Sequence, residues 1–178
     1  MNESTDYIMK AIGQIFATEP EDSAKFVDHI LAAKKIFIYG VGRSGLIGKA
    51  FAIRLVQMGL EVFFVGETVT PIVEEGNLVV IVSYTGETMS AIQTANIVRR
   101  VGAKVITITA SPHSKLAGAS NLVIQIQPPK DEERKRLAPL GTVFEDATLI
   151  YFDSIVAMLM TKLGQSEGSM RKRHAIWV

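Results

Sequence analysis

The sequence contains no cysteine and one tryptophan among its 178 residues. Without cysteine, the chain forms no disulfide bond, no thiolate metal site and no cysteine nucleophile. Net charge is also scarce, because 19 lysine and arginine residues nearly balance 18 acidic ones and leave a formal charge of +1. This balance provides no general attraction to nucleic acid or to an anionic membrane, so an anionic ligand has to be held by a local site.

Long apolar runs are missing as well, although 48% of the residues are hydrophobic. No run approaches the roughly 20 residues of a membrane span, and Asp153 interrupts the best candidate. The first residues are polar and acidic, unlike the basic and then apolar start of a signal peptide. We therefore expect one cytoplasmic domain, with surplus apolar surface for contacts between subunits.

The pattern along the chain predicts an α/β fold. Two amphipathic helices are expected at 5–17 and 21–34, and from Lys35 short β-rich runs alternate with helical stretches. Strands are predicted at 35–40, 61–65, 78–83, 104–109 and 121–126, and later helices at 45–59, 88–101 and 141–163. The alternation is typical of βαβ units, and so of a single three-layer αβα sandwich, flavodoxin-like or Rossmann-like, with a five-stranded parallel sheet.

The remaining segments divide the chain into three parts. Residues 1–34 are predicted to form N-terminal helices, 35–163 the α/β domain, and 164–178 a basic tail. Within the domain, the charged, proline-bearing stretch 127–140 is expected to be a surface loop.

A glycine-rich loop follows the first predicted strand. Its sequence, Gly40-Val-Gly-Arg-Ser-Gly45, fits G-x-G-x-x-G and opens a helix, and Glu67 lies where a dinucleotide fold would bind a ribose. A nicotinamide-binding protein is therefore one alternative. Against it stand the short chain, which leaves no room for a separate substrate domain, and a second loop that a dinucleotide fold does not require.

That second loop, Ser83-Tyr-Thr-Gly-Glu-Thr88, ends the third strand and opens another helix. A helix N-terminus binds phosphate through free backbone N–H groups, and nearby hydroxyl groups add donors. Ser83, Thr85 and Thr88 suit this task, with Gly86 allowing close approach of the backbone. The alternative is that the hydroxyl groups only cap helices. The cluster beside a glycine favours phosphate.

Together, G-x-G-x-S-G after the first strand and S-x-[ST]-G-x-[ST] after the third resemble the sugar isomerase (SIS) family of phosphosugar isomerases and phosphosugar-binding regulators, over residues 35–163. In that family the second loop grips the phosphate and the first lies near the sugar. The resemblance implies substrate-binding roles for Gly42, Arg43, Ser44, Ser83, Thr85, Gly86, Glu87 and Thr88.

Glu145 is the candidate catalytic base. It begins the last predicted helix in Gly141-Thr-Val-Phe-Glu145 and shares an apolar stripe with Phe152 and Leu159, so it should be partly desolvated. Sugar isomerisation needs a base that moves one proton between adjacent carbons, and a desolvated carboxylate suits this. A helix-capping role is the alternative, but G-T-x-F-E is similar to the SIS motif that bears the catalytic glutamate. Asp146 is expected to point elsewhere and to serve only the helix dipole.

His174 is the second catalytic candidate, by resemblance alone. Arg173-His174-Ala175 is similar to the Arg-His-Ala tail of the hexulose phosphate isomerases in this family, which approaches a neighbouring subunit's site. The continuation Ile-Trp-Val departs from the usual Asn-Leu-Glu, and a disordered basic tail is the alternative.

These resemblances imply an isomerase that interconverts a hex-3-ulose 6-phosphate and fructose 6-phosphate, as a homo-oligomer and by resemblance a tetramer. The partner expected is a small phosphosugar, without nucleic acid or membrane. No cofactor and no metal are expected, because one-proton transfer explains the chemistry and no ligand cluster is visible. Two alternatives stay open: an isomerase of another phosphosugar, such as arabinose 5-phosphate, and a non-catalytic phosphosugar sensor.

Overall fold

Five short parallel strands form one sheet in the computed structural model, which describes residues 2–17, 20 and 22–174. They are β1 (Ile36–Gly40), β2 (Val62–Phe64), β3 (Leu78–Val82), β4 (Lys104–Thr109) and β5 (Leu122–Gln125). The order across the sheet is β2-β1-β3-β4-β5, with every neighbouring pair parallel. Strands covered on both faces need continuous apolar sequence, and the central strand β3 is buried at every position. The predicted fold class is confirmed.

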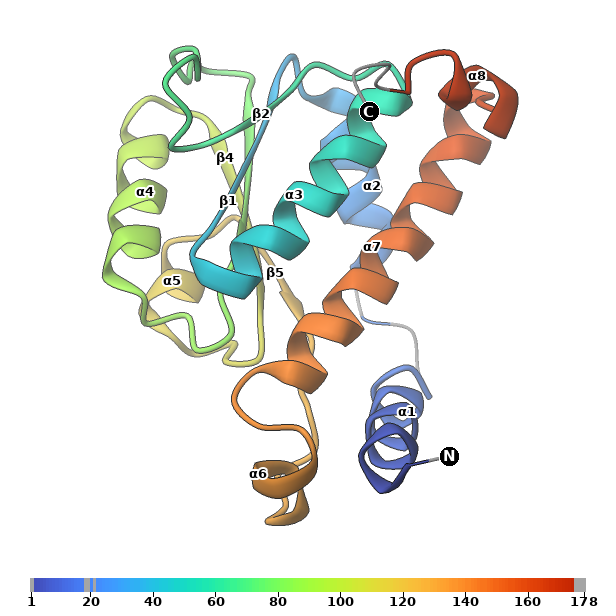
Figure 1. Ribbon diagram of the computed structural model, residues 1–178. Coiled ribbons are helices and arrows are strands. Elements are labelled where there is room, and N and C mark those ends of the chain that lie inside the picture. The colour runs from blue at the N-terminus through green and yellow to red at the C-terminus, as the bar shows by residue number, and fades with distance from the viewer. Residues whose placement is uncertain (1, 18–19, 21, 175–178) are drawn as a thin grey trace.

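Helices cover both faces of this sheet (Figure 1). One face carries α2 (Ser23–Ala32), α3 (Gly42–Gln57) and α7 (Thr142–Leu163) over a core rich in aromatic residues. The other carries α4 (Met89–Arg100) and α5 (Lys115–Gly118) over a core of smaller side chains. The result is three layers.

Helices α3 and α7 run side by side and in the same direction (Figure 1). Arg43 of α3 meets Glu145 of α7 near their N-termini, and further along Phe51 stacks on Phe152 with ring centroids 4.1 Å apart. Because both helices follow this order, their N-terminal ends meet at one edge of the molecule. That edge is where the strands end.

The strand order places a crevice at the same edge. From β1 the chain crosses to β2 on one side and then to β3 on the other, so the connections diverge between β1 and β3. In open α/β sheets, ligands bind at the carboxyl ends of the strands where this reversal occurs.

The segment predicted as a plain surface loop, 127–140, contains a short helix, α6 (Glu133–Leu137). It lies beside the N-terminal helix α1 (Glu3–Ile15), where the Ser4 hydroxyl donates to the Leu137 carbonyl and Arg136 pairs with Glu3. Charge and proline content alone predicted a loop. The helix depends instead on partners more than 120 residues away, which no local pattern reveals.

Beyond α7, a short helix α8 (Glu167–Arg171) occupies part of the predicted tail. Residues 175–178, where that prediction ends, lie outside the described residues. No helix in the part of the chain that the structure describes is long and apolar enough to cross a membrane.

Candidate active site

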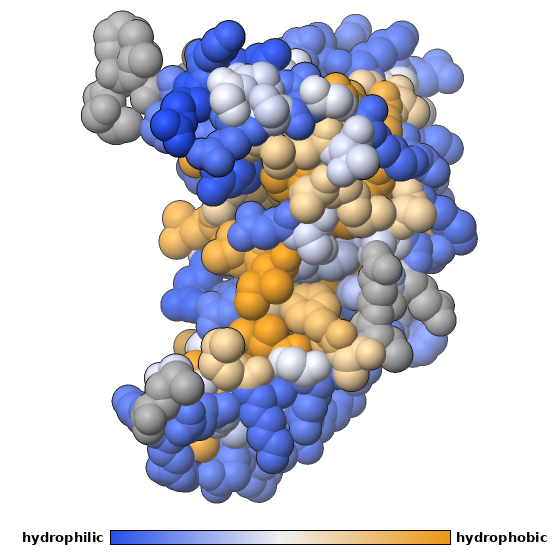
Figure 2. Space-filling model, turned by 90° about the vertical axis from the view of Figure 1, so that its right-hand side faces the viewer, coloured by the Kyte–Doolittle hydropathy of each residue, from blue (hydrophilic) through white to orange (hydrophobic). Residues whose placement is uncertain are grey.

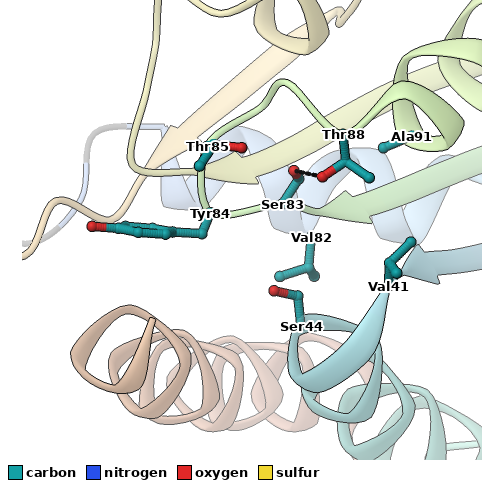
Figure 3. Close-up of a pocket in the computed structure, with 8 residues that line it drawn as sticks. All are labelled: Val41, Ser44, Val82, Ser83, Tyr84, Thr85, Thr88 and Ala91. Atoms are coloured by element: carbon teal, nitrogen blue, oxygen red, sulfur yellow. Dashed lines mark hydrogen bonds between the residues drawn. The ribbon is translucent and has the colours of Figure 1, made fainter. Parts of the chain in front are cut away.

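A small pocket opens at the carboxyl ends of β1 and β3, as the strand order predicts (Figure 3). Its volume is about 180 Å³, below the roughly 300 to 1,000 Å³ of pockets for drug-sized ligands. This size suits a small group such as a phosphate. The residues that line it are Val41, Ser44, Val82, Ser83, Tyr84, Thr85, Thr88 and Ala91.

The first glycine-rich loop builds one wall, but its glycines serve backbone packing. Added Cβ atoms at Gly40 and Gly45 would each lie less than 3.0 Å from the other residue's backbone, so strand β1 and helix α3 touch directly. Helix α3 starts at Gly42, three residues earlier than predicted, and Ser44 in its first turn lines the pocket. Close helix–strand packing thus explains part of the G-x-G-x-x-G spacing without a dinucleotide.

Glu67, the proposed ribose-binding acid, has another partner. Its carboxylate pairs with Lys49 of α3 at 3.2 Å.

The second loop presents hydroxyl groups to the pocket rather than to helix ends. Thr88 is the N-cap residue of α4, yet its side chain makes no capping hydrogen bond. Instead its Oγ1 lies 3.4 Å from Ser83 Oγ, a long contact that leaves both groups free to turn toward a ligand (Figure 3). Thr85 Oγ1 accepts a hydrogen bond from the Glu87 amide, 3.3 Å away. The capping alternative therefore does not account for Thr88.

Gly86 is required by its protein neighbours. Its φ is +65°, and an added Cβ would lie 2.0 Å from the Ser114 hydroxyl at the start of α5. From the sequence, this glycine was predicted to allow close approach of the backbone to a ligand. In the structure, the absence of a side chain at Gly86 is needed for packing against Ser114.

Two helix N-termini meet at the pocket. Neither Val41, the N-cap residue of α3, nor Thr88 of α4 forms a side-chain capping bond, so the first backbone N–H groups of both helices lack such a partner. The positive ends of two helix dipoles, with hydroxyl groups between them, form a site for an anion without any charged side chain in the lining.

Beside the pocket, Glu145 forms an ion pair with Arg43. The glutamate is 7% exposed, which confirms the expected desolvation, whereas the Arg43 side chain is 61% exposed. The hydrogen bond to Glu145 raises the pKa of Arg43, and Arg43 gives the buried carboxylate a positively charged partner. Glu145 does not line the pocket itself, but Arg43 directly precedes Ser44, which does.

The absence of a side chain at Gly141 leaves space for the Glu145 carboxyl group. A Cβ added at Gly141 would lie 3.3 Å from the Glu145 carboxyl carbon and 3.3 Å from Oε1. The carboxyl group is thus folded back over the first turn of α7.

The expectation that Asp146 points elsewhere was wrong. Its Oδ1 lies 3.9 Å from an Arg43 Nη2, so it faces the same guanidinium as Glu145 instead of pointing elsewhere. Burial is the largest effect on its carboxyl group and raises its pKa, while Arg43 opposes the rise. The helical pattern could not show this, because Arg43 comes from a different helix.

Glu87 lies outside the pocket lining. Its carboxylate accepts a hydrogen bond from the Lys115 amide at the start of α5 and pairs with the Lys115 ammonium at 3.2 Å. The backbone hydrogen bond is the main reason that the pKa of Glu87 is lowered. A substrate-binding role for Glu87 remains a prediction.

Tyr84 also lines the pocket, although no role was predicted for it from the sequence. Its ring packs on Phe144, next to Glu145, with centroids 5.1 Å apart. The sequence did contain a signal for this role. Tyr84 is a bulky aromatic residue between two hydroxyl residues, at a strand end where the chain should turn to solvent.

His174 lies at the other end of the molecule. The adjacent Arg173 donates to the Gln57 carbonyl at the C-terminal end of α3, while Arg43 is at its start. Helix α7 has 22 residues, so about 33 Å separate its Glu145 end from the end that leads to His174. His174 is therefore not placed at the site of its own chain. Among the described residues, no three His, Asp or Glu side chains lie together as metal ligands.

Comparison with known proteins agrees with this arrangement. The SIS domain family matches residues 29–159, which is most of the chain. The chain belongs to the SIS domain family. This membership decides against the nicotinamide alternative for the glycine-rich loop.

Several relatives of this SIS domain protein match it over nearly its full length. The 3-hexulose-6-phosphate isomerase of Bacillus subtilis is 35% identical over 97% of this chain and 98% of its own. The enzyme of the same name from Methylomonas aminofaciens is 31% identical over 98% of both chains. A crystal structure from Methanococcus jannaschii, from which a 3-hexulose-6-phosphate isomerase function was inferred, superposes with a TM-score of 0.85 at 32% identity, covering 98% of this chain and 97% of that one.

Proposed function

We propose that this protein is a 6-phospho-3-hexuloisomerase, which interconverts D-arabino-hex-3-ulose 6-phosphate and D-fructose 6-phosphate. One observation carries the proposal: a pocket of neutral anion-binding groups and a buried, ion-paired glutamate lie at the same edge of the sheet, joined through the first turn of α3. The names of the relatives from Bacillus subtilis and Methylomonas aminofaciens support this choice of substrate.

The chemistry of the substrate limits what the site must do. A 3-ketose phosphorylated on O6 cannot close a five-membered hemiketal, because that ring would need the blocked oxygen. The forward substrate is therefore open-chain, and no acid is needed to open a ring in that direction. The site needs a phosphate anchor, one base near C2 and C3, and a donor that polarises the carbonyl group.

Glu145 is assigned the role of base. It takes the proton from C2, the electron pair forms the C2–C3 double bond of an enediol, and the same carboxyl group returns a proton to C3. The hydroxyl proton moves from O2 to O3, so that the ketone at C3 becomes a ketone at C2. Atoms and electrons balance without a cofactor.

Arg43 is assigned two tasks. A guanidinium group carries five N–H donors, and the ion pair with Glu145 uses its Nε, so other donors are available to a carbonyl oxygen beside the base. The same charge stabilises the enediolate that forms when Glu145 accepts its proton.

The Ser83–Thr88 loop, with Ser44 of α3, is assigned the phosphate. The two helix N-termini at the pocket supply backbone donors, and Ser83 and Thr88 supply hydroxyl groups. Binding energy at this remote group positions the reacting carbons against Glu145.

Oligomerisation and the role of His174 belong to the same proposal. Figure 2 shows hydrophobic side chains gathered across the face that carries α1, α2 and α7. Ile150 of α7 is 45% exposed and lines an apolar hollow with Phe16 and Met158. We assign this face to a subunit interface in a homo-oligomer, a tetramer by family resemblance. Since His174 is far from Glu145 in its own chain, it acts only if a neighbouring subunit brings it to the site.

A substrate panel tests the function. Purified protein is given arabino-hex-3-ulose 6-phosphate, arabinose 5-phosphate and glucosamine 6-phosphate, and each product is quantified. We expect conversion of the hexulose phosphate far above the others. Preferred conversion of arabinose 5-phosphate would support the other isomerase, and tight binding without any conversion would support the sensor.

A further inference from the structure

The short helix α6 is fixed in place although it belongs to a charged, proline-bearing connection. Besides the bond from Ser4 to the Leu137 carbonyl, Arg136 donates to both carboxylate oxygens of Glu3, and the Tyr7 hydroxyl lies 2.9 Å from Asp131. Contacts at three positions of α1 therefore hold this segment from one side.

From that fixed segment, Arg134 reaches the pocket loop. Its Nη1 donates a hydrogen bond to the hydroxyl of Tyr84. Within the residues that the structure describes, the Arg134 side chain forms no ion pair, although α6 and its flanks are rich in acidic residues. A half-buried guanidinium thus binds a phenol hydroxyl group instead of a carboxylate.

Tyr84 is consequently held at both ends. Its carbonyl oxygen accepts from the Ala110 amide and from Thr109 Oγ1, each at 3.1 Å, which fixes the backbone against the end of β4. Arg134 fixes the far end of the ring, and Phe144 packs against it at a centroid distance of 5.1 Å. Figure 3 shows the ring extending away from the Ser83–Thr88 hydroxyl pair, above the start of α7.

We propose that Arg134 is a positioning residue: by holding the phenol of Tyr84, it makes the ring a rigid wall that directs the open-chain sugar from the phosphate pocket to Glu145. This inference rests on the proposed function. A sugar anchored only at O6 retains rotation about every carbon–carbon bond, and misplacement by about 1 Å can cost a hundredfold in rate. A fixed aromatic wall beside the phosphate pocket limits that rotation.

The test compares variants at both ends of the Arg134–Tyr84 contact. Arg134→Gln and Tyr84→Phe each remove the hydrogen bond while keeping most of the side-chain volume, and the double variant shows whether the two act as one unit. Arg134→Lys retains a donor. Lys135→Gln is the matched control, because it removes one positive charge from the same helix at an exposed residue whose ion pair is with the neighbouring Glu132 rather than with α1.

For each variant, kcat and KM for hexulose phosphate are measured, together with the Kd for inorganic phosphate by calorimetry. We expect each single variant to lower kcat by about 10- to 100-fold, and the double variant by no more than the worse single one. Phosphate affinity should change by less than about threefold, because the anchor is intact. Arg134→Lys should recover part of kcat, and Lys135→Gln should match the wild type. Normal kcat in Arg134→Gln, additive losses in the double variant, or an equal loss in Lys135→Gln would overturn the proposal.

A second measurement separates this inference from the proposed function. If the wild type converts no phosphosugar, the proposed function fails, and the affinity for D-glucitol 6-phosphate, an open-chain hexitol phosphate, is compared with that for inorganic phosphate. If the ratio of the affinity for D-glucitol 6-phosphate to that for phosphate is lower in Arg134→Gln than in the wild type, the positioning role of Arg134 is supported. An unchanged ratio overturns it.

Discussion

The two halves of the candidate site handle charge in opposite ways. The pocket at the ends of β1 and β3 has no charged residue in its lining and relies on hydroxyl groups and two helix N-termini. Beside it, Arg43, Glu145 and Asp146 form a cluster of full charges at the head of α7. The same edge of the sheet thus holds a neutral anion site and a charged carboxylate site.

Under the proposed function, this difference separates the residues that bind phosphate from those that carry out the chemistry. A phosphate held by neutral donors introduces no lysine or arginine that would compete with Arg43 for the Glu145 carboxylate. The ion-pair partner of Glu145 is therefore Arg43, and the anchor supplies none. Variants in one half should leave the other half's property nearly unchanged.

The largest effect is expected from Glu145→Gln, which keeps the shape of the side chain and removes the base. Because a positioned general base contributes about 10²- to 10⁴-fold, kcat should fall by at least that range, while binding of the sugar phosphate survives. Steady-state kinetics and calorimetry measure the two properties. If binding of the sugar phosphate fell by the same factor as kcat, binding and chemistry would not be separate in the two halves of the site.

Next in size is the effect of Ser83→Ala or Thr88→Ala. Losing a hydrogen bond to a charged phosphate costs about 1.5 to 3 kcal/mol, so KM should rise by roughly 10- to 100-fold with little change in kcat. Thr94→Ala is the matched control on α4, because the Thr94 hydroxyl bonds the Ser90 carbonyl and does not line the pocket. Wild-type KM in both pocket variants would refute the assignment of the phosphate.

The two loops can also be compared by the stability cost of replacing one glycine in each. Gly42 and Gly86 both have positive φ, but a Cβ at Gly42 meets nothing within 4 Å, whereas one at Gly86 meets Ser114. Gly42→Ala should cost about 1 kcal/mol from backbone strain, and Gly86→Ala about 2 to 3 kcal/mol because the clash is added. Urea unfolding measures the difference, and equal costs would contradict the packing role of Gly86.

The smallest effect is expected from Asp146→Asn. Burial raises the folded-state pKa of Asp146, so the charged form costs stability at neutral pH, and the variant should be equal to or slightly more stable than the wild type. The side chain is 39% exposed, which limits the difference to less than about 1 kcal/mol. The difference should disappear as the pH falls below the usual aspartate pKa of 3.8, where the group is protonated in both states. Clear destabilisation at pH 7 would favour the helix-dipole role.

The sheet and the pocket were predictable because their signals are local. A buried parallel strand must be apolar throughout, as β3 is, and strand-end loops of a parallel sheet meet at one edge, which brought Ser44 and Ser83 to one pocket. Burial of Glu145 followed from the apolar stripe that it heads.

Other features depend on contacts that no local pattern reveals. The bond between Arg43 and Glu145 joins residues 102 positions apart, and the Lys115 amide that holds Glu87 lies 28 positions away. Helix α6 looked like a loop because its partners are in α1. In each case the two partners are far apart in the sequence, and only the fold brings them together.

Deuterium exchange tests the central claim most directly, that Glu145 carries one proton between C2 and C3 of a phosphosugar anchored in the Ser83–Thr88 pocket. Hexulose phosphate is converted in D₂O, and the product is analysed by NMR and mass spectrometry. The wild type should incorporate solvent deuterium at C3 of the fructose 6-phosphate that it forms, and Glu145→Gln should show neither turnover nor exchange while still binding substrate. Normal turnover and exchange in Glu145→Gln would contradict the account.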